Sequence, residues 1–531
     1  MPSEQELPEP IRRLLRALGH EHETPRTRRI FTNRDLDFDR VPVIGFDMDY
    51  TLARYRQDRL EALSLEATVD KLIAIGWPEV LREVQPEPEF ATRGLLVDKQ
   101  RGNLVKMDRH GYVGRVYHGR NQLDRPQRKS IYHTQRVGQE RTRFAYVDTL
   151  FSLPEVTLYA AVVDLIDNQP ELWGPGGPPD YANAWNSVRA AIDESHQDDS
   201  IKSRIKADVG AYFDKDPELA PTLHKLRSSG KKLFLLTNSL MDYTEAVMSY
   251  LLDNELDAYD DWTSYFDWMI VGSCKPAFFT AGEPFIEQRR KPNNGNGNGN
   301  GNGGNGNIGK PVTEPLKGRI YAGGNQMGLQ RALGVRPDEI LYVGDHIYGD
   351  IVRSKKTSGW RTVLIVEELE RELRVRADHH VALQEIRQLS ELWELLTEEV
   401  SDQRYMQRGI KLLDVEAILA DYHARGEPLS LAQAEALLDR IRAQTKERLD
   451  RLRTHEEEIA TALRKRSTQV DRAFNRYWGS VFAERYDSSF FGSQLENYAC
   501  MYTSRVSNFL FVSPNRYFHA PHGSMPHWFL P

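Results

Sequence analysis

Short apolar runs that end in an oxygen-bearing or charged side chain are the main pattern along the chain. VIGF is followed by Asp47, LFLL by Thr237 and ILYVG by Asp345. A fourth run, WMIVGSC, leads to Lys275 in the same way. Uninterrupted apolar runs of this length are typical of parallel strands that are buried on both faces. The pattern therefore predicts an α/β fold with a parallel sheet at its centre.

Other stretches predict helices and a second sheet. The residues LEALSLEATVDKLIAIG (60–76) have helical spacing and stop at a glycine before Trp77 and Pro78. Between 93 and 114, apolar and polar residues alternate around glycine-containing turns, which predicts a β meander. Helical patterns dominate from 154 to about 250. Because the meander follows the first apolar run, these elements predict a cap of helices and strands inserted into the core.

A helical hairpin is predicted toward the C-terminus. Residues from about 430 to 475 have a helical pattern in which several apolar positions follow a heptad. Glu456 and Arg466 interrupt this heptad, which favours an antiparallel hairpin packed on the body of the protein over a free coiled coil. The last stretch, from Asn497, is rich in aromatic residues and proline, which predicts a docked C-terminus. The apolar heptad positions are Leu449, Leu452, Ile459, Leu463, Val470 and Ala473.

These patterns divide the chain into segments. The tract PNNGNGNGNGNGGNGN (292–307) has no apolar residue to bury, so we expect a flexible loop. A short helix is expected at about 11–18, within the first segment. The predicted division is a flexible leader (1–30), core with the first motif (31–58), an inserted cap and substrate-recognition region (59–210), the remaining core (211–400), and a helical hairpin with a docked tail (401–531).

Composition narrows the classes of function. The 531 residues, of 61.1 kDa, are enough for two or more packed units, and 40% hydrophobic with 28% charged residues is ordinary globular composition. A net charge of -7 gives no basic field toward nucleic acid or an anionic membrane. No run approaches the ~20 apolar residues that span a bilayer, and the N-terminus has no apolar signal region. With two cysteines, the sequence predicts a soluble cytoplasmic protein without a disulfide framework.

The polar residues at the strand ends suggest phosphoryl-transfer chemistry. Ligands bind beyond the carboxyl ends of parallel strands, so we expect these side chains to share one crevice. Clustered carboxylates can hold Mg²⁺, and the cation, a lysine and hydroxyl groups can neutralise phosphate oxygens. One carboxylate can then attack phosphorus to give an aspartyl phosphate, while a neighbouring carboxyl acts as acid and base. The expected cluster contains Asp47, Asp49, Thr237, Asn238, Ser239, Lys275, Asp345 and Asp350.

Four motifs carry a family resemblance. DMDYT, LLTNS, CKP and GDHIYGD follow one another in an order that resembles the haloacid dehalogenase-like superfamily. The segments FDMDYTLARY, TLFSLPE, CKPAFF and ILYVGDHIYGDIVRSKKTSGWRT resemble more closely the cytosolic purine 5′-nucleotidase family, from about residue 30 to the C-terminal aromatic segment. The resemblance implies a Rossmann-like core with an inserted cap and Mg²⁺-dependent dephosphorylation of IMP and GMP. It also implies a phosphoenzyme, phosphate transfer to another nucleoside, and a tetramer.

The resemblance assigns roles to the acidic residues. Asp47 is the expected nucleophile, and Asp49 is the expected acid and base, whose backbone carbonyl also binds the metal. Asp345 completes the protein ligands of the Mg²⁺ ion, and Asp350 lies close by as an indirect or water-mediated partner. The predicted metal site therefore contains four aspartates.

Residues near the transferred phosphate follow from the same resemblance. Thr237 and Lys275 are expected to bind it, with Asn238 and Ser239 beside them. The alternative for 237–239 is a helix N-cap, which is compatible with phosphate binding because the same N–H groups serve both. Lys275 alone is also open to interpretation as a loop lysine, but its place after a buried run favours the functional role.

The segment SVRAAIDESHQDDSIK resembles the helix of the family that reads the base. Arg189, Asp193 and His196 are spaced to share one helical face, where the first two can read the 6-oxo and ring N–H edge of a purine. The resemblance also places Lys202 at the phosphate and Phe151 in a stack with the base. Without it, a surface ion pair, a solvated histidine and a core phenylalanine are the alternatives.

Some positions depart from the family pattern. Ser152 stands where the family has Asn, and Gln197 where it has Tyr, which puts the base preference in question and leaves the chemistry intact. The family is activated by nucleotides at a separate site, and Lys356 and Tyr348, a Phe in the family, match two of its elements. We therefore include a nucleotide effector among the expected partners.

The sequence thus predicts a Mg²⁺-dependent 5′-nucleotidase for purine nucleoside monophosphates that forms a homo-oligomer. Two alternatives stay open. One is a phosphatase for another phosphomonoester, with the base helix repurposed. The other is a nucleotide-sensing protein that keeps the fold without turnover, which predicts a damaged motif, whereas here each catalytic position is intact.

Overall fold

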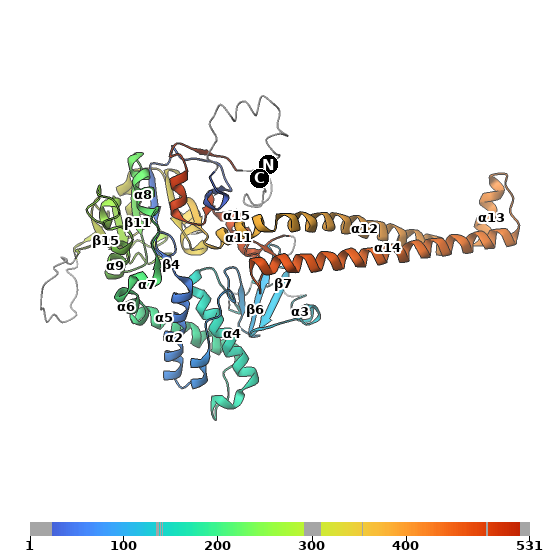
Figure 1. Ribbon diagram of the computed structural model, residues 1–531, viewed down its shortest axis with the longest axis horizontal. Coiled ribbons are helices and arrows are strands. Elements are labelled where there is room, and N and C mark those ends of the chain that lie inside the picture. Colours follow the sequence, from blue (N-terminus) through green and yellow to red (C-terminus); the bar gives the residue numbers. More distant parts are fainter. Residues whose placement is uncertain are drawn as a thin grey trace. The chain divides into compact units, whose positions relative to one another are not determined.

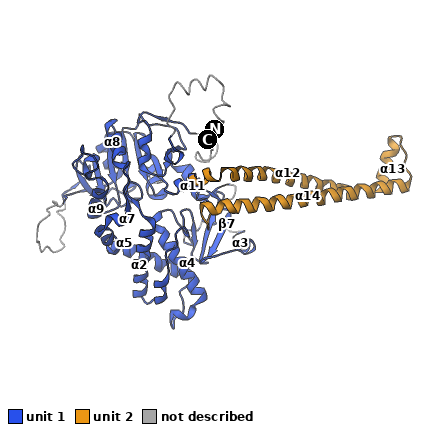
Figure 2. Cartoon of the chain, viewed as in Figure 1, with its two compact units in different colours: residues 1–373, 480–531 blue, residues 374–479 orange. Residues whose placement is uncertain are grey.

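The computed structural model describes residues 24–133, 137–138, 140, 142–290, 309–352, 354–484 and 487–520. The short helix expected at 11–18 and the loop expected at 292–307 lie outside the described residues. The chain forms two compact units, residues 1–373 with 480–531 and residues 374–479 (Figure 2).

A ten-stranded sheet forms the centre of the first unit (Figure 1). Its order is β1-β20-β17-β16-β3-β11-β12-β15-β13-β14, and the seven strands from β20 to β15 pair in parallel. The edge pairings are antiparallel. This arrangement confirms the predicted α/β fold with a parallel sheet. The strands are β1 (Phe31–Thr32), β3 (Val43–Phe46), β11 (Lys232–Leu236), β12 (Trp268–Val271), β13 (Phe285–Gln288), β14 (Pro311–Val312), β15 (Ile320–Gly323), β16 (Ile340–Gly344), β17 (Arg361–Ile365) and β20 (Met501–Thr503).

The central strands are buried throughout, as expected for a sheet covered on both faces. Glycine is required at one point in β3, because a Cβ added to Gly45 would lie 2.0 Å from the ring of Phe234 on β11. The Phe234 ring can therefore pack over β3 because Gly45, two residues before Asp47, has no side chain. The helices of this part are α8 (Leu219–Ser228), α9 (Met241–Leu252), α10 (Gln326–Leu333) and α15 (Phe490–Tyr498), and α11 (Glu368–Asp378) begins here and ends in the second unit.

The inserted segment contains helices and a five-stranded antiparallel sheet in the order β8-β7-β6-β5-β9, which confirms the predicted meander. The chain leaves the core through β4 (Arg54–Tyr55) and returns through β10 (Phe213–Asp214), and these two strands pair antiparallel. The crossing therefore lies close to the limits of 59 and 210 expected for the cap. Its elements are α2 (Gln57–Ala74), β5 (Leu96–Asp98), β6 (Asn103–Met107), β7 (Val113–His118), β8 (Asn121–Gln122), α3 (Arg125–Tyr132), β9 (Phe144–Tyr146), α4 (Leu153–Asn168), α5 (Tyr181–Gln197), α6 (Ser200–Ala207) and α7 (Val209–Tyr212).

Short elements complete the first unit. The 3-10 helices are η2 (Arg26–Arg28), η3 (Glu79–Glu83), η4 (Leu150–Ser152), η5 (Pro170–Trp173), η6 (Trp262–Tyr265), η7 (Ala277–Phe279), η8 (Pro337–Glu339) and η11 (Val506–Phe511), and the π-helical turns are η9 (Ile347–Val352) and η10 (Ser354–Ser358). Two further antiparallel pairs join β2 (Leu36–Asp37) to β21 (Tyr517–Phe518) and β18 (Ala483–Glu484) to β19 (Asp487–Ser488). The C-terminal segment thus adds strands to the core, one of them in the main sheet.

The second unit is a helical hairpin of α12 (His380–Leu412) and α14 (Leu431–Phe474), joined through α13 (Val415–Ala424). Residues further along α12 contact residues that come earlier in α14, so the two long helices are antiparallel, which confirms an antiparallel hairpin. Both charged interruptions of the heptad form interhelical contacts. The division expected at residue 400 falls inside α12, because no glycine or proline interrupts the helix before Gly409, and the compact unit begins at residue 374. The contacts join Glu385 to Arg466, Thr397 to Glu456 and Glu399 to Arg448.

Among the described residues, no helix is both long enough and apolar enough to cross a bilayer.

Candidate active site

Three adjacent strands of the main sheet end at the candidate site. Strand β3 lies between β16 and β11, and the chain order runs outward from it on both sides, to β17 and to β12. Such a reversal of strand order is the place where open α/β sheets bind ligands. Asp47, Thr237 and Asp345 directly follow the three strands, so the topology brings together residues that lie far apart in the sequence.

Asp47 is buried and held by two donors. Its Oδ1 accepts a hydrogen bond of 2.7 Å from the backbone N–H of Met48, and its Oδ2 lies 2.9 Å from Lys275 Nζ. Burial raises the pKa of Asp47 to about 7, although the charge of Lys275 opposes the rise and that of Asp350 adds to it. Lys275 therefore favours the ionised form of Asp47, which is the form that can act as a nucleophile.

Lys275 uses all three ammonium donors inside the site. Besides Asp47, its Nζ lies 2.8 Å from Asp350 Oδ1 and 2.8 Å from the hydroxyl of Tyr342 on β16. Burial lowers the pKa of Lys275, but the charges of Asp350 and Asp47 outweigh it, so the net shift is upward. The ammonium thus stays charged between two carboxylates.

Three carboxylates form a potential cation site. Asp47, Asp345 and Asp350 each offer one oxygen, and these oxygens lie within 4.8 Å of one another. Asp345 Oδ2 is buried and has no hydrogen-bond partner in the described part of the chain. Burial raises the pKa of Asp345 well above its usual range, and Asp350 and Asp47 add to this. Oxygen ligands and an excess of negative charge fit a hard divalent cation such as Mg²⁺.

Asp350 depends on a glycine for its place in this trio. A Cβ added to Gly344, the last residue of β16, would lie 2.6 Å from Asp350 Oδ2. The backbone N–H of His346 donates to the same oxygen over 3.3 Å. A side chain at Gly344 would therefore displace the carboxylate from the end of the strand.

The side chain of Asp49 lies outside the trio. Its Oδ1 accepts a hydrogen bond from the Tyr55 hydroxyl and its Oδ2 one from the Ser239 hydroxyl, each at 2.7 Å. Burial, followed by the charge of Asp49, raises the pKa of Tyr55 well above its usual range, so Tyr55 stays a donor. The carboxyl is thus fixed by two hydroxyls two residues after Asp47, and a metal contact through its backbone carbonyl remains a prediction.

The segment after β11 contains the residues that are expected to bind phosphate. Thr237 is fully buried, and its hydroxyl accepts a hydrogen bond from the backbone N–H of Ser239. The side-chain amide of Asn238 is hydrogen-bonded to the neighbouring loop. Its oxygen accepts from the Ser273 hydroxyl and from the backbone N–H of Lys275, and its nitrogen donates to the Lys275 carbonyl. The residue expected to bind substrate therefore positions Lys275. The N-cap of α9 is Leu240, so residues 237–239 do not cap this helix.

The predicted base-reading residues surround an aromatic cluster. The Phe151 ring packs edge-on against Tyr50 at 4.7 Å and against His196 at 6.0 Å between centroids. Burial lowers the pKa of His196 to about 4, with Lys202 adding to the effect, so the imidazole is neutral at pH 7. Lys202 Nζ lies 5.6 Å from the centroid of the Tyr243 ring. The cluster connects the first motif to the helical cap.

Arg189 and Asp193 form the ion pair that their spacing predicts, with 3.1 Å between Arg189 Nε and Asp193 Oδ2. A third group, which the sequence did not indicate, is Glu155 on α4: its Oε2 lies 2.8 Å from Arg189 Nη1. Arg189 is therefore clamped between two acids, one of them buried.

The comparisons with known proteins identify the family of the chain. A model described as the 5′ nucleotidase family matches residues 30–529. The chain belongs to the 5′-nucleotidase family. This confirms the resemblance at the level of that family, and membership makes the chain a hydrolase of the 5′-nucleotidase class.

Individual relatives are similar over most of the chain. A 5′-nucleotidase domain-containing protein of Dictyostelium discoideum is 28% identical over 492 residues, which cover 91% of this chain and 71% of the relative. The 5′-nucleotidase domain-containing protein 2 of Rattus norvegicus and that of Homo sapiens are 32% identical over 359 residues, 65% of this chain. The match spans 60% of the rat protein and 64% of the human protein, less than two thirds of either.

One solved structure that the chain matches is that of CbbY from Rhodobacter sphaeroides in complex with phosphate. The two sequences are 13% identical, and the match covers 61% of this chain and 86% of that chain. Its TM-score of 0.21 is too low to bear on the fold, which rests on the strand order described above.

Two further residues at the candidate site have no role assigned to them from the sequence. Tyr342 lies inside β16, and Arg93 precedes β5. The fully buried Arg93 donates from Nη1 to the carbonyl of Asp345 at 2.9 Å, pairs with Glu368 and lies 5.2 Å from the centroid of the Phe491 ring. A charged residue in an apolar alternation was the only signal in the sequence.

The positions that depart from the family pattern differ in their exposure. Ser152 is buried in η4 and Gln197 is exposed at the end of α5. Tyr348 is partly exposed in η9, and the side chain of Lys356 lies outside the described residues. A nucleotide effector at this place remains a prediction.

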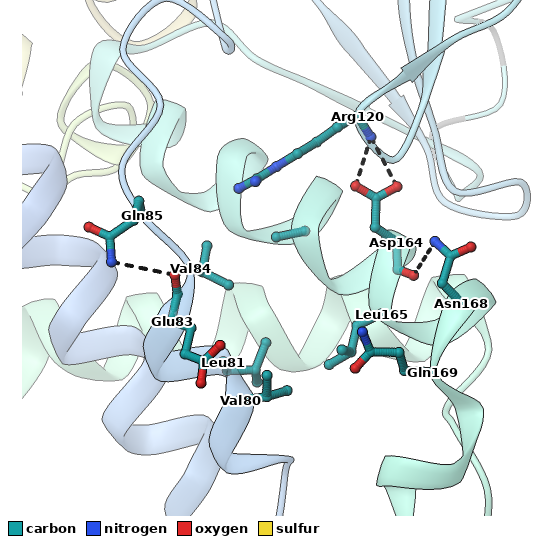
Figure 3. Close-up of a pocket in the computed structure, with 11 residues that line it drawn as sticks. Val80, Leu81, Glu83, Val84, Gln85, Arg120, Asp164, Leu165, Asn168 and Gln169 are labelled. Carbon is teal, nitrogen blue, oxygen red and sulfur yellow. Dashed lines mark hydrogen bonds between the residues drawn. The ribbon is translucent and has the colours of Figure 1, made fainter.

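A cavity of about 350 Å³ lies elsewhere in the cap of this nucleotidase-family chain (Figure 3). Its walls include Leu81, Val84 and Leu165, with Arg120 and Asp164 on one side. None of the candidate catalytic residues lines it, so the cavity does not mark the reaction site.

Proposed function

We propose that the chain hydrolyses purine nucleoside 5′-monophosphates such as IMP and GMP through an aspartyl phosphate on Asp47. The observation that carries the proposal is the position of Lys275 Nζ, 2.9 Å from Asp47 and 2.8 Å from Asp350 at the carboxyl end of the parallel strands. A cation between the nucleophile and a metal-binding carboxylate is placed to neutralise a phosphoryl group that enters between them. Membership in the 5′-nucleotidase family supports the substrate class, and the motif order supports a place in the haloacid dehalogenase-like superfamily.

In the first step, a carboxylate oxygen of Asp47 attacks phosphorus, and the bond from phosphorus to the nucleoside 5′-oxygen breaks. The leaving oxygen takes a proton from Asp49, whose carboxyl is held next to the nucleophile by the hydroxyls of Tyr55 and Ser239. Lys275 and the Thr237 hydroxyl stabilise the charge on the phosphate oxygens. The products of this step are the nucleoside and the aspartyl phosphate.

In the second step, water attacks the phosphorus of the aspartyl phosphate and gives its proton to Asp49. The bond between phosphorus and the Asp47 oxygen breaks, which regenerates the carboxylate and releases phosphate. A nucleoside hydroxyl in place of water would accept the phosphoryl group, so the same intermediate supports phosphotransfer to nucleosides.

Asp47, Asp345 and Asp350 would hold the Mg²⁺ ion, together with the Asp49 carbonyl. When bound, the ion supplies positive charge for the phosphate oxygens and balances the three buried carboxylates. The unpartnered Asp345 Oδ2 and the raised pKa of its carboxyl support a cation at this place.

The cap supplies base recognition in this proposal. Phe151 and the neutral His196 offer flat apolar faces for a purine, and Lys202 is a cation for the phosphate side. Arg189, held by two acids, presents its remaining donors to the 6-oxo group. A cytoplasmic homo-oligomer, tetrameric by resemblance, and a nucleotide effector site near Tyr348 complete the proposal.

The test is release of inorganic phosphate from IMP, GMP, AMP, UMP and a sugar phosphate, with Mg²⁺ or with a chelator. We expect Mg²⁺-dependent release that favours IMP and GMP and is lost in Asp47→Asn. Equal rates for all esters would instead support a phosphatase of another specificity. Tight nucleotide binding without release, with or without ATP as activator, would favour the nucleotide-sensing alternative and contradict the proposal.

A further inference from the structure

Glu155 is a buried acid beside the proposed base site that the mechanism above leaves unused. It lies in the first turn of α4 and is 1% exposed. Its Oε2 accepts a hydrogen bond of 2.8 Å from Arg189 Nη1, whereas Oε1 is buried without a hydrogen-bond partner among the described residues. An unpaired buried oxygen costs the desolvation energy of the group, so this arrangement favours a donor from a bound ligand.

The second acid on Arg189 is in a different situation. The side chain of Asp193 is 47% exposed, and that of Glu155 is 1% exposed. Solvent can therefore satisfy the free oxygen of Asp193, while Oε1 of Glu155 is shielded from it. Of the two carboxylates, Glu155 is the one that a substrate donor would complete.

Glu155 and Arg189 also lie on the same helical faces as the proposed stacking residues. Phe151 precedes Glu155 by four positions, and His196 follows Arg189 by seven, so each pair shares a face of its segment. Across the two segments, Phe151 meets His196 at 6.0 Å between ring centroids, and Glu155 meets Arg189 at 2.8 Å. An aromatic pair thus lies beside a charged pair, which is the combination that a flat ring with a polar edge requires.

We infer that Glu155 is a specificity-determining residue of the substrate site, whose Oε1 accepts the ring N1–H of a 6-oxopurine while Arg189 donates to its 6-oxo group. This inference rests on the proposed function and names the acid that reads the base. It assigns Asp193 the separate role of holding Arg189 from the solvent side.

The donor and acceptor pattern explains the selection. A 6-oxopurine presents an acceptor at O6 next to a donor at N1, whereas a 6-aminopurine presents a donor next to an acceptor. Arg189 and Glu155 match the first pattern and oppose the second. Sites that hydrogen-bond a substrate N–H discriminate strongly against analogues that lack it, because the buried partner is then left unpaired.

The test compares kcat/KM for IMP, its N1-methyl derivative, AMP and p-nitrophenyl phosphate, which has no base. In the native chain we expect IMP to exceed both other nucleotides. In Glu155→Gln, an isosteric change, the loss for IMP should be at least about tenfold greater than that for p-nitrophenyl phosphate and should appear mainly in KM. The ratio of IMP to N1-methyl-IMP should fall toward one.

Asp193→Asn is the matched control, because it changes the other acid on Arg189. It should lower kcat/KM for IMP, while the ratio of kcat/KM for IMP to that for N1-methyl-IMP stays as in the native chain. Loss of that ratio in Asp193→Asn and its retention in Glu155→Gln would overturn the inference, because the exposed acid would then read the ring. A native chain that cleaves p-nitrophenyl phosphate but no nucleotide would reject the proposed function itself. Nucleotide cleavage with unchanged selectivity in Glu155→Gln would reject only the inference.

A pH profile supplies an independent readout. Arg189 and Asp193 face Glu155 from α5, and Asp148 faces it from the segment before η4. Burial raises the pKa of Glu155 to about 7, which Arg189 opposes and the two aspartates support. The ratio of IMP to p-nitrophenyl phosphate should therefore fall as the pH drops below 7 in the native chain and be flat in Glu155→Gln. A native ratio independent of pH would contradict a carboxylate acceptor at Glu155.

Discussion

Lys275 Nζ lies 2.9 Å from Asp47 Oδ2, and both side chains are buried where the parallel strands end. Asp350 and the Tyr342 hydroxyl take the other two donors of the ammonium group. The proposed nucleophile and one carboxylate of the potential cation site are therefore held by the same positive charge. A phosphoryl group entering the site would exchange contacts within a preorganised set of charges.

The first prediction concerns this lysine. We expect Lys275→Met to lower kcat by about a hundredfold or more, which is the usual cost of removing a preorganised charge from the transition state. The substitution also removes the positive charge of Lys275, which lowers the pKa of Asp47. The pKa of Asp47 therefore rises, and the pH profile of the rate moves to higher pH. Phosphate release measured across the neutral pH range checks both effects. Lys317→Met, at an exposed lysine, is the control; a native kcat in Lys275→Met would contradict this assignment.

The second prediction concerns the cation. Mg²⁺ should raise the thermal unfolding temperature of the native chain, because a ligand at a hundredfold excess over its Kd stabilises the folded state by about 2.7 kcal/mol. Asp345→Asn should lose most of this increase, since the buried oxygen without a partner is then part of an amide. Asp58→Asn, on the exposed surface of α2, should keep it. An equal Mg²⁺ response in all three proteins would exclude Asp345 as a ligand.

The third prediction tests the glycine at the end of β16. A methyl group in Gly344→Ala would meet Asp350 Oδ2 at 2.6 Å, so the carboxylate must move. We expect kcat to fall at least about tenfold, because a misplacement of about 1 Å at a reacting group can have effects of this size and larger. Circular dichroism and thermal unfolding establish that the variant is folded. Gly282→Ala, where the same atom would meet nothing within 4 Å and the backbone is not in the left-handed region, is a control for the substitution itself.

Much of the site could be predicted because its residues directly follow apolar runs. Asp47, Thr237 and Asp345 lie immediately after parallel strands, and the sheet topology then determines that they meet. Residues that reach the site from the middle of an element have no such marker. Tyr342 lies within β16, and Glu155 within a helix that is apolar on most sides.

The roles of individual side chains were harder to predict than their positions. Asn238 follows its strand as expected, yet its amide is occupied by the loop that contains Lys275, where it bonds to the backbone of that lysine and to the Ser273 hydroxyl. The hairpin also begins earlier than the sequence predicts. Helix α12 has few buried positions, so its own sequence carries only a weak apolar pattern.

The fourth prediction concerns pH and stability. Burial, followed by Lys202, lowers the pKa of His196 to about 4, compared with 6.5 for an ordinary histidine. The unfolded chain therefore binds this proton at a higher pH than the folded chain. The contribution of His196 to the free energy of unfolding is therefore fully present above about pH 6.5. It is lost progressively as the pH falls toward 4, by an amount on the order of 2 kcal/mol for a partly exposed ring.

His196→Gln should flatten this part of the pH dependence in urea unfolding experiments, because glutamine does not titrate. His110→Gln replaces a histidine whose side chain is 66% exposed and should retain the native slope. The comparison of the two variants separates the contribution of the His196 ring from that of the carboxylates, which also titrate as the pH falls. A slope between pH 4 and 6.5 that is identical in His196→Gln and in the native chain would show that the imidazole is solvated, and Phe151 would then lack the neutral partner that the proposed base site requires.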